Sequence, residues 1–312
     1  FWDDQSGPQR KVSGVFSKDD LQKLMNRRTE RLNLTGVPID DKITDRYYQK
    51  EAIRAVCGQM EQGFRKHLLV MATGTGKTRT AASLTDVLSR GKWVTNILFL
   101  ADRTALVKQA KDDFKNYLPD MSLCNLCFNK DDRNTRIVFS TYPTILNAID
   151  DTKSKDGRQL FTPVHFDLII IDESHRSIFK KYRAIFEYFD AVMVGLTATP
   201  KTDVDRNTYD FFEMENGVPT YAYDYETARD QDHVLVPYYN YEVKTEFQEK
   251  GITYDKLSDE DKERYEEDFI EDGMMPEFIP STDLNKFVFN ETTVDIVLQD
   301  LMERGIDRKS VV

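Results

Sequence analysis

The chain has 312 residues, of which 40% are hydrophobic and 31% charged, and its net charge is −11. This length is sufficient for one large hydrophobic core and part of a second. No run of about 18 apolar residues is present and the first residues do not form a signal peptide, so we expect a cytoplasmic protein without a membrane span.

The first 35 residues contain a stretch with helical periodicity, residues 18–32. This stretch belongs either to a domain upstream or to an arm that packs on the lobe that follows it. Gly36 and Pro38 punctuate the boundary, so we expect the first lobe to span residues 36–235.

Residues 71–78, here called the candidate phosphate loop, carry the most informative pattern, MATGTGKT. They follow a short apolar strand at residues 67–70 and precede a helix whose apolar face ends before Gly91. Glycines at two positions permit a sharp turn that directs backbone N–H groups at a polyanion. A triphosphate is therefore expected to contact Thr73, Gly74, Thr75, Gly76, Lys77 and Thr78.

Two residues of this loop have the more specific chemistry. Lys77 adds a point charge for the β- and γ-phosphates, and the Thr78 hydroxyl is the expected Mg²⁺ ligand. Met71 stands where Gly or Ala is usual, and the alternative is an ordinary glycine-rich turn between a strand and a helix.

Two further strands follow, at residues 96–101 and 136–141, and each ends in polar residues. Three cysteines are too few and too scattered for a disulfide framework. Cys124 and Cys127 lack the second half of a zinc site, so we expect two reduced core thiols.

An acidic pair, Asp172-Glu173, stands at the carboxyl end of the apolar run Leu168–Ile171. Ligand crevices of parallel sheets open at this end of the strands. Asp172 can hold a magnesium ion through water, and Glu173 can orient and deprotonate the attacking water. The alternative is a solvated loop or a helix cap.

A last strand, within residues 192–200, also ends in hydroxyl side chains. Strands and helices alternate at this spacing along the whole of residues 67–200. The fold class predicted from the alternation is α/β, with a doubly wound parallel sheet.

Across residues 71–200 the chain resembles the superfamily 2 helicase and translocase motors. The resemblance is carried, in order, by the motifs MATGTGKT, LADRTALVKQA, STYPTI, DESH and GLTATP. The wording is closest to the R subunit of type I restriction enzymes, which pumps duplex DNA. DESH in place of DEAD and TATP in place of SAT favour this subunit over an RNA helicase.

The resemblance implies a RecA-like lobe that uses ATP and Mg²⁺ and binds double-stranded DNA. It also implies methyltransferase (M) and specificity (S) subunits as partners, of which the specificity subunit recognises the DNA site. Lys77, Asp172 and Glu173 would be the catalytic residues, and Thr78 and Asp172 the metal ligands.

Residues 46–52 look like the adenine-reading segment of these motors. The Gln49 amide can both donate to and accept from an adenine edge, and Arg46, Tyr47 or Tyr48 can stack on the base. The alternative is the polar first turn of a helix.

Further site residues come from the same resemblance. Nucleic-acid contacts are expected from Arg103, Thr141 and Thr144, for which simple capping is the alternative. Coupling of the ATP site to DNA is expected from His175, Thr197 and Thr199, although a structural histidine is the alternative for His175.

Beyond the first lobe we expect a connecting strand and an acidic insertion at 236–286, then the truncated start of a second lobe at 287–312 with a helix at 292–303. Residues 259–272 contain nine carboxylates and two cationic side chains, so this stretch carries most of the net negative charge of the chain. Because carboxylates repel phosphates, we expect the stretch to stay off the DNA path.

A nuclease site would need metal-binding carboxylates and a lysine. The one candidate set is Glu242-Val243-Lys244, with Asp224 and Asp232 upstream, and we interpret the Glu242–Lys244 stretch as an alternating surface strand instead. We therefore expect an incomplete motor that alone neither cleaves nor pumps DNA. The alternatives are a nucleotide-binding scaffold that does not cycle and a DNA-repair or RNA helicase.

Overall fold

The computed structural model describes residues 9–14, 16–128, 135–150, 160–174, 182–200, 207–237, 252–256, 262 and 278–279. The chain divides into two compact units, Phe1–Pro237 and Tyr238–Val312. In the second unit, β8 (Ile252–Thr253) pairs antiparallel with β9 (Phe278–Ile279), and a 3-10 turn, η4, covers Tyr254–Lys256. Every other described helix and strand belongs to the first unit.

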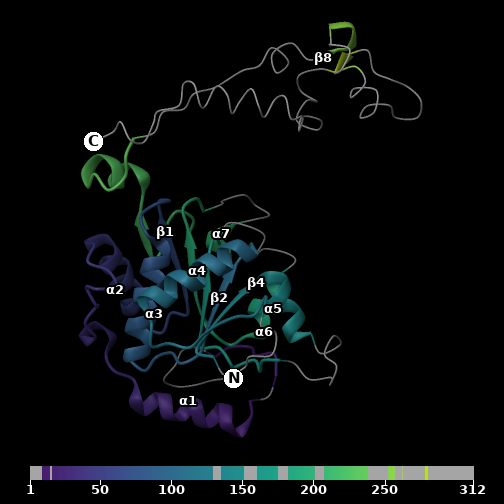
Figure 1. Ribbon diagram of the computed structural model, residues 1–312. Coiled ribbons are helices and arrows are strands. Elements are labelled where there is room, and N and C mark those ends of the chain that lie inside the picture. Colours follow the sequence, from purple (N-terminus) through teal and green to yellow (C-terminus); the bar gives the residue numbers. More distant parts are fainter. Residues whose placement is uncertain are drawn as a thin grey trace. The chain divides into compact units, whose positions relative to one another are not determined.

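A seven-stranded sheet in which all strands are parallel forms the centre of the first unit (Figure 1). In sheet order the strands are β3 (Leu123–Asn125), β4 (Ile137–Thr141), β2 (Ile97–Ala101), β5 (Leu168–Ile171), β6 (Val192–Thr197), β1 (Lys66–Met71) and β7 (Tyr221–Tyr223). The central strands are continuous apolar runs because both of their faces are buried. The predicted doubly wound α/β fold is confirmed.

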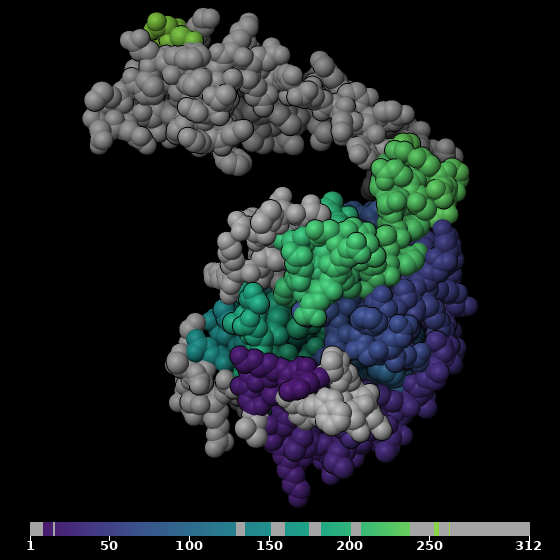
Figure 2. All heavy atoms as spheres, turned by 180° about the vertical axis from the view of Figure 1, so that it is seen from behind, coloured from purple at the N-terminus to yellow at the C-terminus, as the bar shows by residue number. Residues whose placement is uncertain are grey.

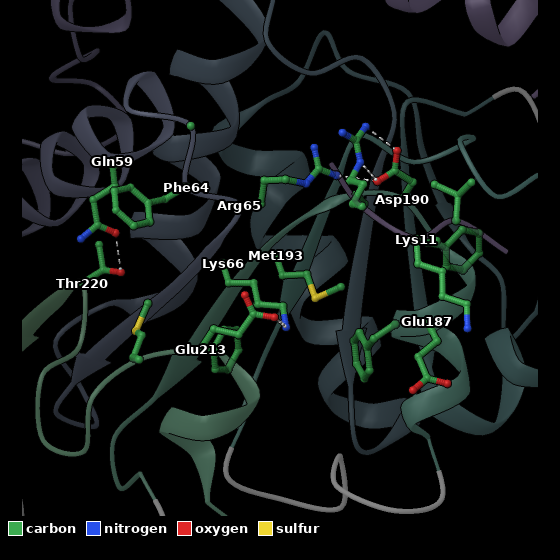
Figure 3. Close-up of a pocket in the computed structure, with 18 of the residues that line it drawn as sticks. Lys11, Gln59, Phe64, Arg65, Lys66, Glu187, Asp190, Met193, Glu213 and Thr220 are labelled. Carbon is green, nitrogen blue, oxygen red and sulfur yellow. Dashed lines mark hydrogen bonds and ion pairs between the residues drawn. The ribbon is translucent and has the colours of Figure 1, made fainter. Parts of the chain in front are cut away.

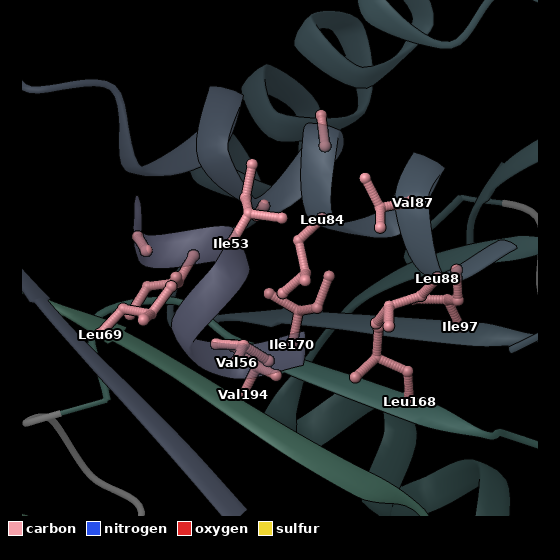
Figure 4. Close-up of a cluster of buried hydrophobic side chains, with 14 of the residues drawn as sticks. Ile53, Val56, Leu69, Leu84, Val87, Leu88, Ile97, Leu168, Ile170 and Val194 are labelled. Atoms are coloured by element: carbon pink, nitrogen blue, oxygen red, sulfur yellow. The ribbon is translucent and has the colours of Figure 1, made fainter. Parts of the chain in front are cut away.

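Two sets of helices cover the two faces of the sheet. One face carries α2 (Tyr47–Glu61), α3 (Lys77–Arg90) and α4 (Thr104–Tyr117), and the other carries α5 (Tyr142–Ile149), α6 (Arg183–Tyr188) and α7 (Thr208–Phe211). Because successive residues of a strand point to opposite faces, Ile170 joins the first core while Ile169 and Ile171 join the second. Figure 4 shows the first core, where Val56 and Leu84 pack beside Ile170.

Two strands of the sheet were not predicted. β3 and β7 are three residues long, which is too short for a periodicity to be visible in the sequence. β3 contains Cys124, which is buried, and Cys127 is half-buried; neither forms a disulfide in the described part of the chain.

The N-terminal arm (residues 9–14 and 16–32) packs against the amino-terminal ends of the strands. It contains helix α1 (Lys18–Glu30), and a 3-10 turn, η1 (Leu34–Gly36), follows it. Arg10 donates to Asp190 at 2.6 Å, and Lys23 and Arg27 pair with Asp167 at 3.1 and 2.5 Å. Asp190 lies just before β6, and Asp167 lies just before β5. Figure 2 shows the described part of the arm, in purple, at the foot of the lobe.

Several predictions fall outside the described residues. They are the strand at 238–244 with its Glu242-Val243-Lys244 set, the helix at 292–303, and the acidic stretch 259–272 apart from Lys262. No helix of the described ranges is long and apolar enough to cross a membrane.

A buried histidine on β1 leads to a prediction about acid stability. His67 is 0% exposed, its Nδ1 lies 3.1 Å from Gln59 Oε1, and burial lowers its pKa from 6.5 to about 4. The unfolded chain takes up a proton below pH 6.5 whereas the folded chain does not, so the stabilisation is complete above this pH and is lost as the pH falls toward 4. Acidification to about pH 5 should therefore cost about 2 kcal/mol at this residue, at ~1.4 kcal/mol per pH unit.

Denaturant unfolding at about pH 7.5 and about pH 5 tests this prediction. His67→Asn, whose amide can still donate to Gln59, should reduce the pH dependence, and the contribution of His165, whose pKa burial also lowers to about 4, should remain. His233→Asn, at an exposed ring, is the control for replacing a histidine by asparagine. An unchanged slope in His67→Asn would assign the acid sensitivity to other groups.

Candidate functional site

The candidate phosphate loop leaves β1 at Met71 and enters α3 at Lys77. Gly74 and Gly76 have φ of +88° and +87°, a left-handed conformation that favours glycine. Between them Thr75 is fully buried, and its hydroxyl donates to the Ala72 carbonyl at 2.7 Å. The loop is thus held in a tight turn at the N-terminus of a helix, the arrangement in which backbone N–H groups receive phosphate.

Gln49 lies beneath this loop. Its Nε2 donates to the Thr75 carbonyl at 2.8 Å and its Oε1 accepts from the Thr44 hydroxyl. A Cβ atom on Gly76 would lie only 2.5 Å from Gln49 Nε2. The amide is 1% exposed, so the structure directs it at the loop, and a contact with adenine stays a prediction.

The three residues expected to stack on a base differ in exposure. Tyr48 is 1% exposed, and its hydroxyl accepts from Arg46 at 2.7 Å and donates to the Thr75 carbonyl at 3.2 Å. Tyr47 is 51% exposed, and Arg46 is exposed as well. Among these three, only Arg46 and Tyr47 present a surface that a base can reach.

The acidic pair stands at the end of β5, two strands from the phosphate loop, and the Asp172 N–H donates to Leu100 of β2 at 2.9 Å. Burial, and then the charge of Glu173, raise the pKa of Asp172 to about 6, while Lys77 opposes the shift. Glu173 has a φ of +50°, a conformation that is unusual for a residue with a side chain and clusters at functional sites.

The carboxylate and hydroxyl near Lys77 fit a magnesium ion. Thr78 is half-buried on the first turn of α3, and Lys77 is near enough to Asp172 for its charge to influence that carboxyl. In the described ranges no three His, Cys, Asp or Glu side chains gather into a metal-binding group.

The expected nucleic-acid contacts are placed at the ends of neighbouring strands. Arg103 is exposed just before α4. Thr141 and Thr144 are brought together, with their hydroxyl oxygens 2.9 Å apart, but Thr141 is only 9% exposed. Of these three side chains, Arg103 is therefore the most accessible to a DNA backbone.

Two of the three expected coupling residues, Thr197 and Thr199, lie at the end of β6 and just after it. Thr197 is fully buried and its Oγ1 accepts from the N–H of Thr199 at 3.2 Å, whereas Thr199 itself is exposed. His175 lies outside the described residues. The structure thus joins two of the three residues through a turn at the end of a central strand.

A hollow of about 920 Å³ lies at the amino-terminal ends of β1 and β6, opposite the carboxyl ends that carry the candidate site (Figure 3). Four of the charged groups that line it are paired: Arg65 donates to Asp190 at 2.8 Å, and Lys66 to Glu213 at 2.7 Å. The hollow is roomy, but the loop, the acidic pair and the strand-end hydroxyls are at the carboxyl edge, where parallel sheets bind ligands.

A parallel sheet with a glycine-turned loop after β1 and an acidic pair after β5, at one edge, defines a RecA-like lobe of the helicase type. Residues 42–202, just over half of the chain, match the family described as type III restriction enzyme, res subunit. The chain belongs to this family.

Two relatives indicate the branch of restriction enzymes. The chain is 37% identical over 198 residues to the type I restriction enzyme EcoAI endonuclease subunit of Escherichia coli, which covers 62% of this chain and 23% of that protein. It is 31% identical over 209 residues to the EcoKI endonuclease subunit of E. coli strain K12, covering 59% and 17%. The resemblance to type I R subunits is confirmed, and the chain spans less than a quarter of these relatives.

Among solved structures, a fragment of a type I restriction enzyme HsdR subunit from Vibrio vulnificus YJ016 is 30% identical, with a TM-score of 0.45. The match covers 68% of this chain and 37% of that chain.

Proposed function

We propose that this lobe binds and hydrolyses ATP with Mg²⁺ and is part of a motor that moves double-stranded DNA in a type I restriction enzyme. The observation that carries the proposal is the meeting of the candidate phosphate loop and the acidic pair at one edge of the sheet, where Lys77 influences Asp172. The membership in a restriction-enzyme family supports the choice of DNA as the polymer that is moved.

The residues have separate roles in the proposed reaction. The loop and Lys77 bind the β- and γ-phosphates, and Thr78 and Asp172 hold the metal, Asp172 through water. Mg²⁺, when bound, offsets the charge of the phosphate oxygens. Glu173 accepts a proton from a water molecule while the oxygen of that water attacks the γ-phosphorus. The bond between the γ-phosphorus and the bridging oxygen breaks, and ADP leaves with that oxygen.

The wider assignment follows from the relatives. We propose that the methyltransferase and specificity subunits are the partners, that the specificity subunit selects the DNA site, and that the complex acts in the cytoplasm. Arg103, Thr141 and Thr144 would hold the DNA backbone, and His175, Thr197 and Thr199 would couple it to the ATP site.

Calorimetry with MgATP and a hydrolysis assay with duplex DNA, single-stranded DNA or RNA as separate stimulants test the proposal on the 312-residue chain. We expect MgATP binding and the largest stimulation by duplex DNA. Stimulation by RNA alone would assign an RNA helicase. Binding without hydrolysis under every condition would assign a nucleotide-binding scaffold.

A further inference from the structure

The segment that follows β7, residues 224–237, here called the exit segment, lies outside the family match, and none of the motifs that carry the resemblance to the helicase and translocase motors includes it. A helical turn of the π type, η3 (Thr227–Gln231), forms its first half. Figure 2 shows residues 207–237 as the green surface of the lobe. Its contacts lead directly to the candidate phosphate loop.

One carboxylate joins the exit segment to two other elements. Asp232 Oδ2 accepts from the Tyr223 hydroxyl of β7 at 2.6 Å and from the Tyr47 hydroxyl of α2. Phenol donors to an ionised carboxylate make short, strong hydrogen bonds. These two bonds, that from Tyr223 first, also lower the pKa of Asp232, so the carboxylate is charged at neutral pH.

From Tyr223 the contacts continue to the phosphate loop. The rings of Tyr223 and Tyr48 are stacked, with centroids 4.1 Å apart and planes at 6°, and the Tyr48 hydroxyl donates to the Thr75 carbonyl at 3.2 Å. The Tyr223 carbonyl accepts from the Ala72 N–H at 2.9 Å. Both tyrosines are almost fully buried, so their positions set those of Ala72 and Thr75.

The end of the exit segment reaches the loop a second time. The N–H groups of Val234 and Leu235 both donate to the Ala228 carbonyl, at 2.8 and 3.1 Å, around His233 with its φ of +52°. This turn brings Leu235 over the loop, where its Cδ2 lies 3.1 Å from the position of a Cβ on Gly74. Asp232 is the side chain that ties this turn to α2 and β7.

We propose that Asp232 is a positioning residue of the nucleotide site, which holds Tyr223, Tyr47 and the exit segment so that the candidate phosphate loop keeps the shape that receives phosphates. This inference rests on the proposed function. Asp232 lies outside the motifs of the nucleotide site. It positions Thr75 through the stacked Tyr223 and Tyr48, and it positions Gly74 through Leu235.

Asp232→Asn keeps the size of the side chain and removes its charge. We expect the Kd for MgATP and for a non-hydrolysable ATP analogue to rise about tenfold, the scale of one hydrogen bond to a charged group. The kcat at saturating MgATP should change less than about twofold, because Lys77 and Glu173 are untouched. Tyr47→Phe with Tyr223→Phe should reproduce the loss, and adding it to Asp232→Asn should have little further effect.

Asp230→Asn is the matched control, since the exposed Asp230 lies two residues away and pairs with the half-buried Arg229 of the same segment. It should bind MgATP like the parent. If Asp232→Asn does not fold, the phenylalanine pair, which keeps both rings, carries the test. A parent that binds MgATP together with an Asp232→Asn variant of equal affinity would overturn this inference alone. A parent that does not bind MgATP would overturn the proposed function.

Discussion

Replacement of Glu173 by glutamine is expected to leave MgATP binding unchanged and to slow hydrolysis by about 10²- to 10⁴-fold, the usual contribution of a general base. The amide has the size of the carboxylate but cannot accept a proton from water. The backbone strain at position 173 is unchanged, because the φ of +50° costs a glutamine as much as it costs a glutamate. The fold, and the position of Asp172 as the proposed metal ligand, should therefore be retained.

Hydrolysis at saturating MgATP with duplex DNA, and calorimetry with a non-hydrolysable analogue, measure the two effects separately. Glu187→Gln is the control, since Glu187 is exposed on α6 and pairs with Arg183. Hydrolysis at the parent rate in Glu173→Gln would remove Glu173 from the role of the base. A loss of binding would make it a structural or metal-binding residue instead.

The second large effect is expected from Gly76→Ala. An alanine there would adopt a φ of +87°, and its Cβ would lie 2.5 Å from Gln49 Nε2, so the loop or the Gln49 amide must move. The left-handed conformation costs roughly 1–2 kcal/mol, and the overlap adds about 1–3 kcal/mol. We expect the affinity for MgATP to fall by about 10- to 100-fold or more, because the backbone N–H groups no longer converge on the phosphates.

Gly63→Ala separates the two causes. Gly63 has a φ of +92°, but no atom lies within 4 Å of its Cβ position, so this variant has the conformational cost without the overlap. It should lose stability in thermal unfolding and keep its affinity for MgATP. Combining Gly76→Ala with Gln49→Ala should restore part of the binding if the overlap matters. Equal affinities of Gly76→Ala and Gly63→Ala would show that the contact with Gln49 is unimportant.

Both expectations concern residues that local sequence pattern identified. The candidate phosphate loop and the acidic pair each follow a short apolar strand, and the chain geometry that exposes them is built by neighbours within a few residues. A parallel sheet gathers the carboxyl ends of its strands at one edge whatever their order, so the placement of Lys77 and Asp172 in one region could also be predicted. The fold class and the family could likewise be predicted, because both depend on local sequence patterns.

The packing of side chains from distant parts of the chain could not be read in this way. The strand order, the two three-residue strands β3 and β7, and the arm held by Asp167 and Asp190 depend on contacts between residues far apart in sequence. Gln49 carries the chemistry to read adenine, but whether its amide faces a base or the loop is set by the neighbouring Thr44 and Thr75.

The same limit applies to Asp232, 185 residues after Tyr47, to which it is hydrogen-bonded. In the sequence Asp232 stands out only as an aspartate upstream of the Glu242-Val243-Lys244 set, and no periodicity or motif connects it with the candidate phosphate loop. Its surroundings exist only after β7 has paired with β1 and placed Tyr223 on Tyr48. Local geometry thus follows from neighbours in sequence, whereas the groups that support the site are selected by burial and hydrogen bonding in the folded lobe.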